Sequence, residues 1–260
     1  MNAKYRIVIL GLLLQVMATY SSTSMADIHV VGGTVPFVLH GEHPGPHNII
    51  FNTTIVEAAP SNLERTMLPY ARAIRDFQAR EFDCLYATTN NPFYFAPSLI
   101  ENQILLISRP VNTIKLHIYS RDGENVIHAL EDMRGKTIVG TRNQLRPVKE
   151  QLGTEGARFI TVFDAPKAFE LLNIKRADIA AVYNMDAHLT VPGQIAEYSA
   201  QNKPQTTRYL YDARFAPAEW GEILACWNRP ETKLFIENFD KQVTQLETTG
   251  ALSSIFDTFK

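Results

Sequence analysis

Short apolar runs with strand character alternate with amphipathic helical stretches along most of this chain, and this alternation limits what it can fold into. Residues 179–183 form one such run, and residues 230–246 repeat apolar side chains at helical spacing. The alternation predicts an α/β protein with largely parallel sheets. We expect strands at 27–31, 48–54, 82–87, 103–108, 113–119, 137–139, 159–163, 178–183, 208–211 and 222–227, and helices at 63–77, 126–133, 165–173 and 230–246.

Glycine and proline residues mark several of the expected boundaries. Gly32 and Gly33 are expected to end the first strand. Pro69 predicts an irregular first turn inside the helix at 63–77. The segment 140–146 is expected to be a loop that leads to Pro147, because proline favours the first position of a helix.

The first 26 residues predict a secretory signal peptide. Lys4 and Arg6 precede an apolar run at 7–18, and Ser24-Met25-Ala26 places small residues ahead of Asp27. This order is typical of a cleaved signal, and the apolar run is too short to span a bilayer as a helix. No cysteine lies near the expected cleavage point. We therefore expect a soluble periplasmic protein that is not a lipoprotein.

The composition is that of a globular protein with one large domain or two small ones. Hydrophobic residues make up 45% of the chain and charged residues 20%, and the formal net charge is -2. These values argue against disorder, and they exclude a nucleic-acid-binding protein, which would carry a clustered basic surface. We expect a monomer with no cofactor.

Two small groups of residues have the chemistry of a cross-link or of metal ligands. Cys84 and Cys226 allow either one disulfide or two buried free thiols. His40, His43 and His47 lie close together in the segment HGEHPGPH. The two prolines and two glycines of this segment fit neither helix nor strand, so we expect a solvated loop rather than a metal site.

Four internal stretches and the C-terminal segment form a characteristic series. Their order and spacing resemble the family 3 extracellular solute-binding proteins of bacterial ABC importers, which have the type II periplasmic binding fold. The resemblance covers most of the chain after residue 26. The stretches are RDFQAREFDCLYATT (75–89), ISRPVNTIKLHIY (107–119), HALEDMRGKTIVG (128–140), AFELLNIKRADIAAV (168–182) and LFIENFDKQVTQLETTGALSSIFD (234–257).

This resemblance implies two α/β lobes joined by two crossovers, each lobe with a mostly parallel sheet flanked by helices. Lobe 1 would comprise residues 27–112 and 220–260, and lobe 2 residues 113–219. A ligand would bind between the lobes at the carboxyl ends of strands, and closure would be a hinge motion. In the resembling fold Cys84 and Cys226 lie on neighbouring strands of lobe 1, so a cross-strand disulfide would form if the two side chains face each other.

The resemblance also implies which residues would contact a ligand. They come from an aromatic position that often covers the ligand, from the polar turn after the third strand, and from two segments of lobe 2. A plain turn after the third strand and a core position for the aromatic residue are the alternatives. The residues are Phe37; Thr88 and Asn90; Thr141, Arg142, Asn143 and Gln144, just before a helix start; and Tyr183 and Asn184.

Two departures from the family pattern change the expected ligand. The arginine that usually binds an α-carboxylate is missing from residues 91–95, and Tyr183 stands near the place of the aspartate that pairs with an α-amino group. Asp186 could replace that aspartate only if its loop bends back. We therefore expect a small polar or anionic ligand, with Arg142 at the anion, rather than a standard α-amino acid. A solvated position for Arg142 is the alternative.

The expected function is capture of a small molecule for an ABC permease. A sensor or accessory protein of the same fold, which binds a membrane sensor or another protein partner, is the alternative. A periplasmic dehydratase-like enzyme is the third reading. It lacks support because no Ser-His-Asp, Cys-His or paired-carboxylate motif stands out, and Asp186 and Glu101 are the only nearby acids.

Overall fold

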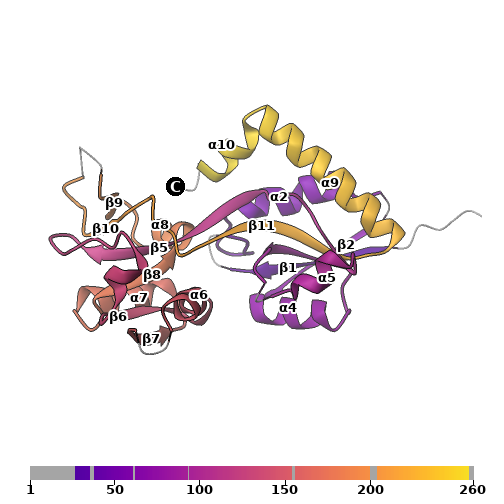
Figure 1. Cartoon of the computed structure of the whole chain (residues 1–260). Helices are drawn as coiled ribbons and strands as arrows, with labels where there is room; N and C mark the ends of the chain where they lie inside the picture. Colours follow the sequence, from indigo (N-terminus) through magenta and orange to yellow (C-terminus); the bar gives the residue numbers. More distant parts are fainter. Residues whose placement is uncertain are drawn as a thin grey trace, which may run out of the picture.

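Two groups of strands and helices are joined by the long strands β5 (Asn112–Arg121) and β11 (Ala218–Trp227) (Figure 1). We name the group that contains β1 to β4 lobe 1 and the group that contains β6 to β10 lobe 2. This computed structural model describes residues 27–35, 38–60, 62–92, 94–153, 156–199 and 204–257, so the expected signal peptide lies outside the described residues. Within those ranges, no helix has the length and apolar character needed to cross a membrane.

Lobe 1 is a mostly parallel sheet with helices on both faces. β1 pairs in parallel with β2 and β3, and β11 runs antiparallel to β3 and β4. Successive side chains of β1 point to opposite faces of the sheet and pack into different hydrophobic clusters. Val30 packs in the cluster that contains Phe235 of α9, and Val31 packs in the cluster that contains Phe77 of α4. The elements are β1 (Ile28–Thr34), β2 (Leu63–Pro69), β3 (Cys84–Thr89), β4 (Leu105–Ile107), α2 (Pro46–Asn52), α3 (Thr54–Ala58), α4 (Tyr70–Gln78), α5 (Pro97–Glu101), α9 (Pro230–Thr248) and α10 (Ala251–Asp257).

Lobe 2 repeats this arrangement. β8, β6 and β7 are parallel neighbours, and β5 joins them through an antiparallel pairing with β8. Val139 of β6 clusters with Phe169 of α7, whereas Ile138 clusters with Leu145 of α6, so helices again cover both faces. The elements are β6 (Thr137–Thr141), β7 (Arg158–Val162), β8 (Ile179–Tyr183), β9 (Ile195–Glu197), β10 (Tyr209–Tyr211), α6 (Arg142–Leu152), α7 (Ala165–Asn173), α8 (Asn184–Thr190) and the 3₁₀ turn η1 (Leu130–Met133).

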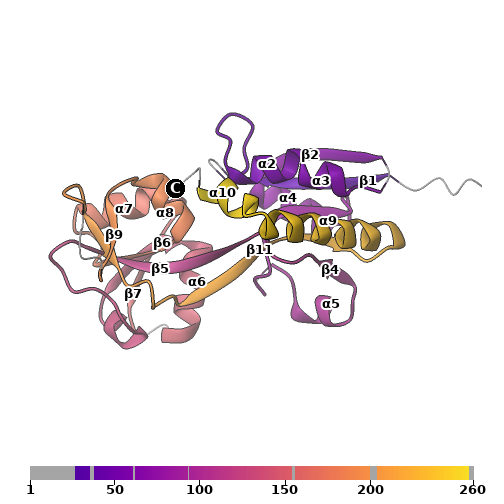
Figure 2. The same ribbon diagram turned by 90° about the horizontal axis from the view of Figure 1, so that it is seen from above.

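β5 and β11 form the connection between the lobes, which is seen from above in Figure 2. Residues 112–116 of β5 pair antiparallel with residues 218–222 of β11. Further along, β5 pairs with β8 in lobe 2, and β11 pairs with β3 in lobe 1. The lobe boundaries expected near residues 112 and 220 fall within these two strands, and a division at those positions stays a prediction.

A disulfide joins Cys84 of β3 to Cys226 of β11. The two residues are register partners in the sheet, and both side chains are fully buried. Of the two alternatives that the sequence allows, a disulfide and two free thiols, the disulfide is therefore confirmed. It links two strands of lobe 1 whose cysteines are 142 residues apart in the chain.

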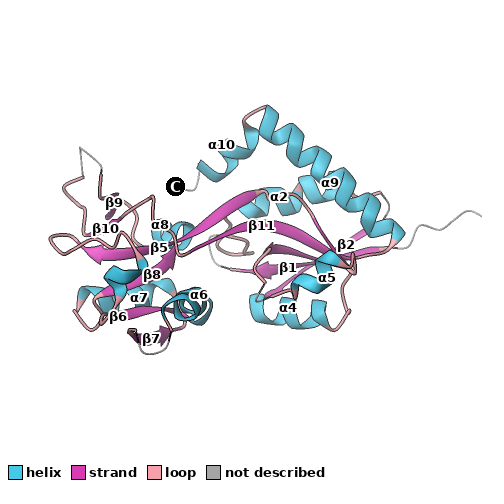
Figure 3. Ribbon diagram, viewed as in Figure 1, coloured by secondary structure: helices cyan, strands magenta, loops and turns pink. Residues whose placement is uncertain are grey.

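Two elements expected in lobe 1 have different secondary structure (Figure 3). Residues 48–54 were predicted as a strand but lie in α2 and α3, because Pro46 occupies a first-turn position and Ile50 and Phe51 are buried on one face. Residues 63–69 were predicted as helix but form the strand β2, which pairs with β1 along its whole length. A short apolar run does not distinguish the two structures, so tertiary pairing decides.

Expected boundaries also moved at two places in lobe 2. α6 begins at Arg142 rather than at Pro147, because the Thr141 side chain accepts a hydrogen bond from the backbone N–H of Gln144 and so caps the helix. Residues 142–146 are therefore helical and not a loop. Of the helix expected at 126–133, only η1 forms.

β1 passes through its two glycines and ends at Thr34, so these residues do not terminate the strand. They allow close packing instead. A Cβ atom on Gly32 would lie 2.8 Å from Leu39, and one on Gly33 would lie 2.5 Å from the ring of Tyr70.

Candidate functional site

A cavity of about 580 Å³ lies between the two lobes. The final residues of β3, β6 and β8 all border it, which is where open α/β sheets bind ligands. Both lobes contribute to its lining. The lining includes Tyr70, Ala87, Thr89, Tyr94 and Glu222 from lobe 1 and the connecting strand β11, and Thr141, Asn143, Gln144, Phe163, Asp164, Tyr183 and Asp186 from lobe 2.

An irregularity in β3 shapes one side of the cavity. Thr88 pairs with Ile223, but the next pairing joins Leu85 to Ala225, so two residues of β3 face one residue of β11. Within this bulge Ala87 has φ 56°, in the left-handed region that residues with a side chain rarely adopt. Such strain persists where the surrounding structure enforces it, and here it redirects the end of β3 beside the cavity.

Thr89, the last residue of β3, brings a hydroxyl group to this cavity. Its side chain is only 8% exposed, and its Oγ1 has no hydrogen-bond partner in the described part of the chain. Thr89 is the register partner of Glu222 in β11, so the two side chains lie on the same face of the sheet. A buried hydroxyl without a hydrogen-bond partner is unfavourable.

Glu222 is a buried carboxylate held by lobe 1 and β5. Its Oε2 lies 3.0 Å from His47 Nε2 and accepts a 2.7 Å hydrogen bond from Asn112 Nδ2. His47 Nδ1 lies 2.9 Å from the hydroxyl of Tyr86, which completes a buried chain of polar groups. Burial raises the pKa of Glu222, but His47 and the Asn112 bond more than offset this and hold the pKa below its usual range. The group is therefore ionised at neutral pH.

Asp186 faces the cavity from the first turn of α8, and its environment opposes ionisation. Burial, followed by the negative charge of Glu222, raises the pKa of Asp186 to about 7. Gln144 Nε2 donates a 3.1 Å hydrogen bond to Oδ2 and partly counters this rise. Gln144 is in turn fixed by α6, where its side chain also accepts from the backbone N–H of Thr141.

Aromatic side chains form much of the remaining lining. The rings of Tyr70 and Tyr94 meet edge to face with their centroids 5.9 Å apart, and Tyr94 accepts a 2.7 Å hydrogen bond from Asn143 Nδ2 of the opposite lobe. Burial raises the pKa of Tyr183, so its hydroxyl stays protonated. Phe163 is 88% exposed although it borders the cavity, so its ring is accessible to a ligand or to lobe 1.

The charge of the lining is one-sided. Three carboxyl groups border the cavity, those of Asp164, Asp186 and Glu222, whereas no lysine, arginine or histidine of the described residues does. Asp164 is also the N-cap of α7 and accepts a hydrogen bond from the backbone N–H of Lys167. The site therefore favours positive or neutral groups over anions.

Four of the predicted contact residues line the cavity: Thr141, Asn143, Gln144 and Tyr183. Thr88 is fully buried beside the lining and is not part of it. Arg142 is exposed at the start of α6 and does not border the cavity. Phe37 lies outside the described residues.

The two predicted asparagines have structural partners instead. Asn90 Oδ1 accepts a hydrogen bond from the backbone N–H of Gly221, and Asn184 Oδ1 accepts one from the backbone N–H of Lys115. Neither borders the cavity. Each of them instead tethers its own segment to one of the two connecting strands.

Sequence reasoning missed Thr89 and Glu222 and left Asp186 conditional on a bend of its loop. The bend is the start of α8 directly after Tyr183, which brings Asp186 to the cavity. Glu222 had a recognisable signal, since it is an acidic residue in the otherwise apolar run Gly221 to Trp227. Thr89 had none, because its position depends on the bulge in β3.

The segment with three histidines is divided between a turn and a helix. His40 Nδ1 accepts hydrogen bonds from the backbone N–H groups of Glu42 and His43, whereas His47 is buried in α2 against Glu222. Across the described ranges, no group of three or more His, Cys, Asp or Glu side chains is arranged to hold a metal ion. That the protein uses no metal stays a prediction.

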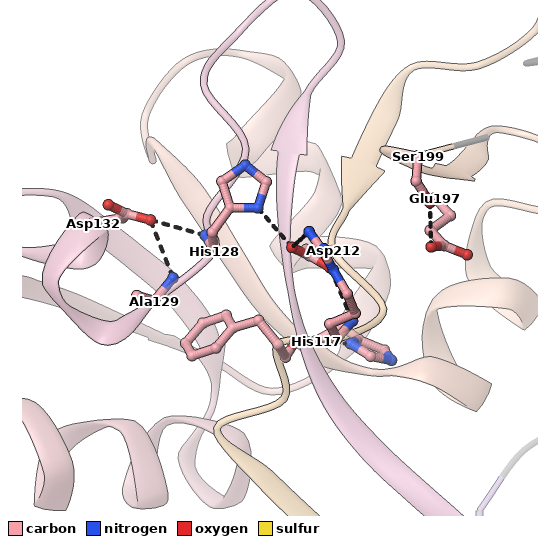
Figure 4. Close-up of polar contacts among 9 residues, drawn as sticks. His117, His128, Ala129, Asp132, Glu197, Ser199 and Asp212 are labelled. Carbon is pink, nitrogen blue, oxygen red and sulfur yellow. Dashed lines mark hydrogen bonds and ion pairs between the residues drawn. The ribbon is translucent and has the colours of Figure 1, made fainter. Parts of the chain in front are cut away.

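A second polar cluster lies in lobe 2, around Asp212 (Figure 4). His128 Nδ1 lies 2.6 Å from Asp212 Oδ2, and Arg214 also donates to this carboxylate. The Arg214 bonds, and then the His128 bond, hold the pKa of Asp212 well below its usual range. Ser199 donates to Glu197, not to His128, so this cluster has no Ser-His-Asp arrangement.

Solved structures with a similar fold cover nearly the whole chain. The GluR0 ligand-binding core in complex with L-glutamate matches with a TM-score of 0.65 and 14% identity, over 92% of this chain and 99% of that one. An ancestral arginine-binding protein bound to arginine matches with a TM-score of 0.62 and 17% identity, over 90% and 99%. The unliganded L-cystine solute receptor of Neisseria gonorrhoeae gives 0.60 and 15%, over 90% and 92%.

Other similar structures are substrate-binding proteins of amino acid ABC transporters, with identities of 13% and 15%. No family model and no curated protein matches the amino-acid sequence. At these identities the likeness shows the fold, which is that of the type II periplasmic binding proteins. The fold class predicted from the sequence is thereby confirmed.

Proposed function

We propose that this chain is a solute-binding protein that captures a small polar ligand between its two lobes. The observation that carries the proposal is the interlobe cavity of about 580 Å³, which polar and aromatic side chains of both lobes line. A ligand that contacts both lobes interacts better with the closed than with the open arrangement, so it shifts the population toward closure. The amino-acid ligands named for the similar structures support a small molecule of comparable size.

The lining narrows the class of ligand. No described arginine borders the cavity, so the carboxylate of a standard α-amino acid has no bidentate partner there. The exposed position of Arg142 also weighs against the anionic ligand expected from the sequence. We therefore propose a small polar ligand that is not a standard α-amino acid and does not depend on an anionic group.

We propose a periplasmic location, with residues 1–26 as the signal peptide and an ABC permease as the membrane partner. The Cys84–Cys226 disulfide supports this location, because disulfides persist in oxidising compartments. A membrane sensor protein is the alternative partner. With either membrane partner, the proposed role of this chain is the same: its two lobes capture a ligand in the cavity.

A thermal-shift screen of the chain from Asp27 tests the proposal. Amines, amino acids, organic acids, sugars and aromatic acids cover the main solute classes. A ligand at 100 times its Kd adds about 2.7 kcal/mol to the free energy of unfolding, so a true ligand raises Tm visibly.

We expect the stabilisation to be lost in Tyr183→Ala, which opens the lining, and kept in Tyr198→Ala, which removes a half-exposed tyrosine outside the cavity. A flat response across all classes would contradict the proposal and favour an accessory protein that binds another protein.

A further inference from the structure

Three residues on different elements line the interlobe cavity, and each has an oxygen without a hydrogen-bond partner among the described residues. Thr89 Oγ1 is buried and unpaired. Glu222 receives both its hydrogen bonds on Oε2, which leaves Oε1 without one, and Asp186 receives its bond from Gln144 on Oδ2, which leaves Oδ1 without one. Thr89 is the independent sign of a ligand here, since it is a nearly fully buried hydroxyl that the protein itself does not satisfy.

The elements that carry these oxygens place them on both sides of the cavity. Thr89 and Glu222 are cross-strand partners on β3 and β11, so their side chains lie next to each other. Asp186 approaches from α8 in lobe 2, and it lines the same cavity as Glu222. A group that binds between them would contact both lobes.

We propose that Asp186, Glu222 and Thr89 bind the primary ammonium group of a small amine that lacks a carboxylate. The inference rests on the proposed function and names the ligand class of the same cavity. A primary ammonium has three N–H donors and no acceptor, which matches three unpaired acceptors of which two belong to carboxyl groups. Charge-assisted hydrogen bonds of this kind are the strong ones.

The rest of the lining suits the body of such an amine and not a carboxylate. Tyr70, Tyr94 and Tyr183 present aromatic surfaces, and Ile114 and Leu189 add aliphatic surface. A carboxylate on the ligand would have no basic partner among the described lining residues, and it would lie near Asp186 and Glu222.

The proposal predicts that acidification weakens binding. The charged and titratable groups that face Asp186 are Glu222 on β11, Tyr94 after β3, Tyr183 at the end of β8 and Tyr119 on β5. The tyrosines stay neutral because burial raises the pKa of each, whereas Asp186, with its pKa raised to about 7, titrates between pH 6 and pH 8. An ammonium binds the ionised form. With the Asp186 pKa at about 7, amine affinity falls about tenfold from pH 8 to pH 6.

Matched pairs of probes that differ only by a carboxylate test the ligand class. Isothermal titration calorimetry of the chain from Asp27 at pH 8 compares 2-phenylethylamine with L-phenylalanine, and 1,4-diaminobutane with L-ornithine. We expect at least one amine to bind, and to bind at least tenfold more tightly than its amino-acid counterpart. An amino acid that binds as tightly as its amine overturns the inference.

Variants test the assigned oxygens with the amine that binds. Asp186→Asn keeps an acceptor for Gln144, so we expect the fold to persist while amine affinity falls at least tenfold and loses its dependence on pH. Thr89→Val should lower the affinity several-fold and keep the pH dependence. Glu219→Gln is the control, since this exposed carboxylate on β11 pairs with Lys115 and does not border the cavity. Unchanged amine binding in Asp186→Asn overturns the assignment.

The outcomes separate this inference from the proposed function. If neither amine binds while a solute of another class stabilises the protein in the thermal-shift screen, the inference fails and the proposed function stands. If no solute of any class binds, both fail.

Discussion

Replacement of Asp186 by asparagine should stabilise the empty protein at neutral and alkaline pH. The folded state raises the pKa of this carboxyl from 3.8 to about 7, chiefly through burial and then through Glu222. A raised carboxyl pKa means that the folded state holds the proton more tightly than the unfolded state does. The contribution of the Asp186 carboxyl to the free energy of unfolding is therefore fully present below about pH 4 and is lost as the pH rises to 7.

The size of this effect follows from the same shift. Each pH unit between the two pKa values lowers the free energy of unfolding of the wild-type protein by about 1.4 kcal/mol relative to a variant with no charge at this position. The full shift of about three units corresponds to about 4 kcal/mol, and solvent in the cavity reduces it. We therefore expect Asp186→Asn to be more stable than the wild type by about 1–4 kcal/mol above pH 7. Asparagine retains an oxygen that accepts the hydrogen bond from Gln144.

Urea unfolding at pH 5, 6, 7 and 8, without ligand, measures the difference directly. The advantage of the variant should grow from pH 5 to pH 7 and then level off. Glu219→Gln serves as the matched control, because exposed ion pairs contribute only about 0–1 kcal/mol and should show no such trend. A variant that is less stable than the wild type at pH 8, or a difference independent of pH, would refute the reasoning.

Two further predictions concern the frame of the cavity. Replacing Cys84 and Cys226 together by alanine should lower the free energy of unfolding by about 3–5 kcal/mol, because the disulfide closes a loop with a sequence separation of 142. Urea unfolding with and without reductant measures this loss of stability. A loss below about 1 kcal/mol would contradict the prediction. Gly33→Ala should lower the free energy of unfolding by about 1–3 kcal/mol and weaken ligand binding, since the added Cβ would lie 2.5 Å from the Tyr70 ring. Gly41→Ala, where the added Cβ would meet nothing within 4 Å, should change stability by less than about 0.5 kcal/mol.

The buried strands of lobe 2, such as β8, and the helix at 165–173 could be predicted because their sequence patterns match their environment. Residues 179–183 are apolar throughout, and β8 is buried on both faces. The stretch 63–69 was misread because β2 is an edge strand with largely exposed side chains, so it has no apolar alternation to identify it. Helix α6 was placed too late because the cap at Thr141 outweighs the preference of Pro147 for a first-turn position.

The cavity was only partly predictable for a related physical reason. Thr141 and Tyr183 end parallel strands, and the rule that ligands bind at such ends located them. Thr89 and Glu222 become neighbours through a pairing between residues far apart in sequence, and a bulge sets its register. No local pattern encodes that register. The exposed position of Arg142 likewise follows from the early start of α6.

A crystal structure of the chain from Asp27 with the most stabilising solute of the thermal-shift screen tests the central claim most directly. The account predicts that the solute lies in the interlobe cavity and contacts residues of both lobes, including Thr89 from lobe 1 and Asp186 from lobe 2. A solute bound elsewhere on the molecule, or to one lobe alone with the cavity unoccupied, would contradict it.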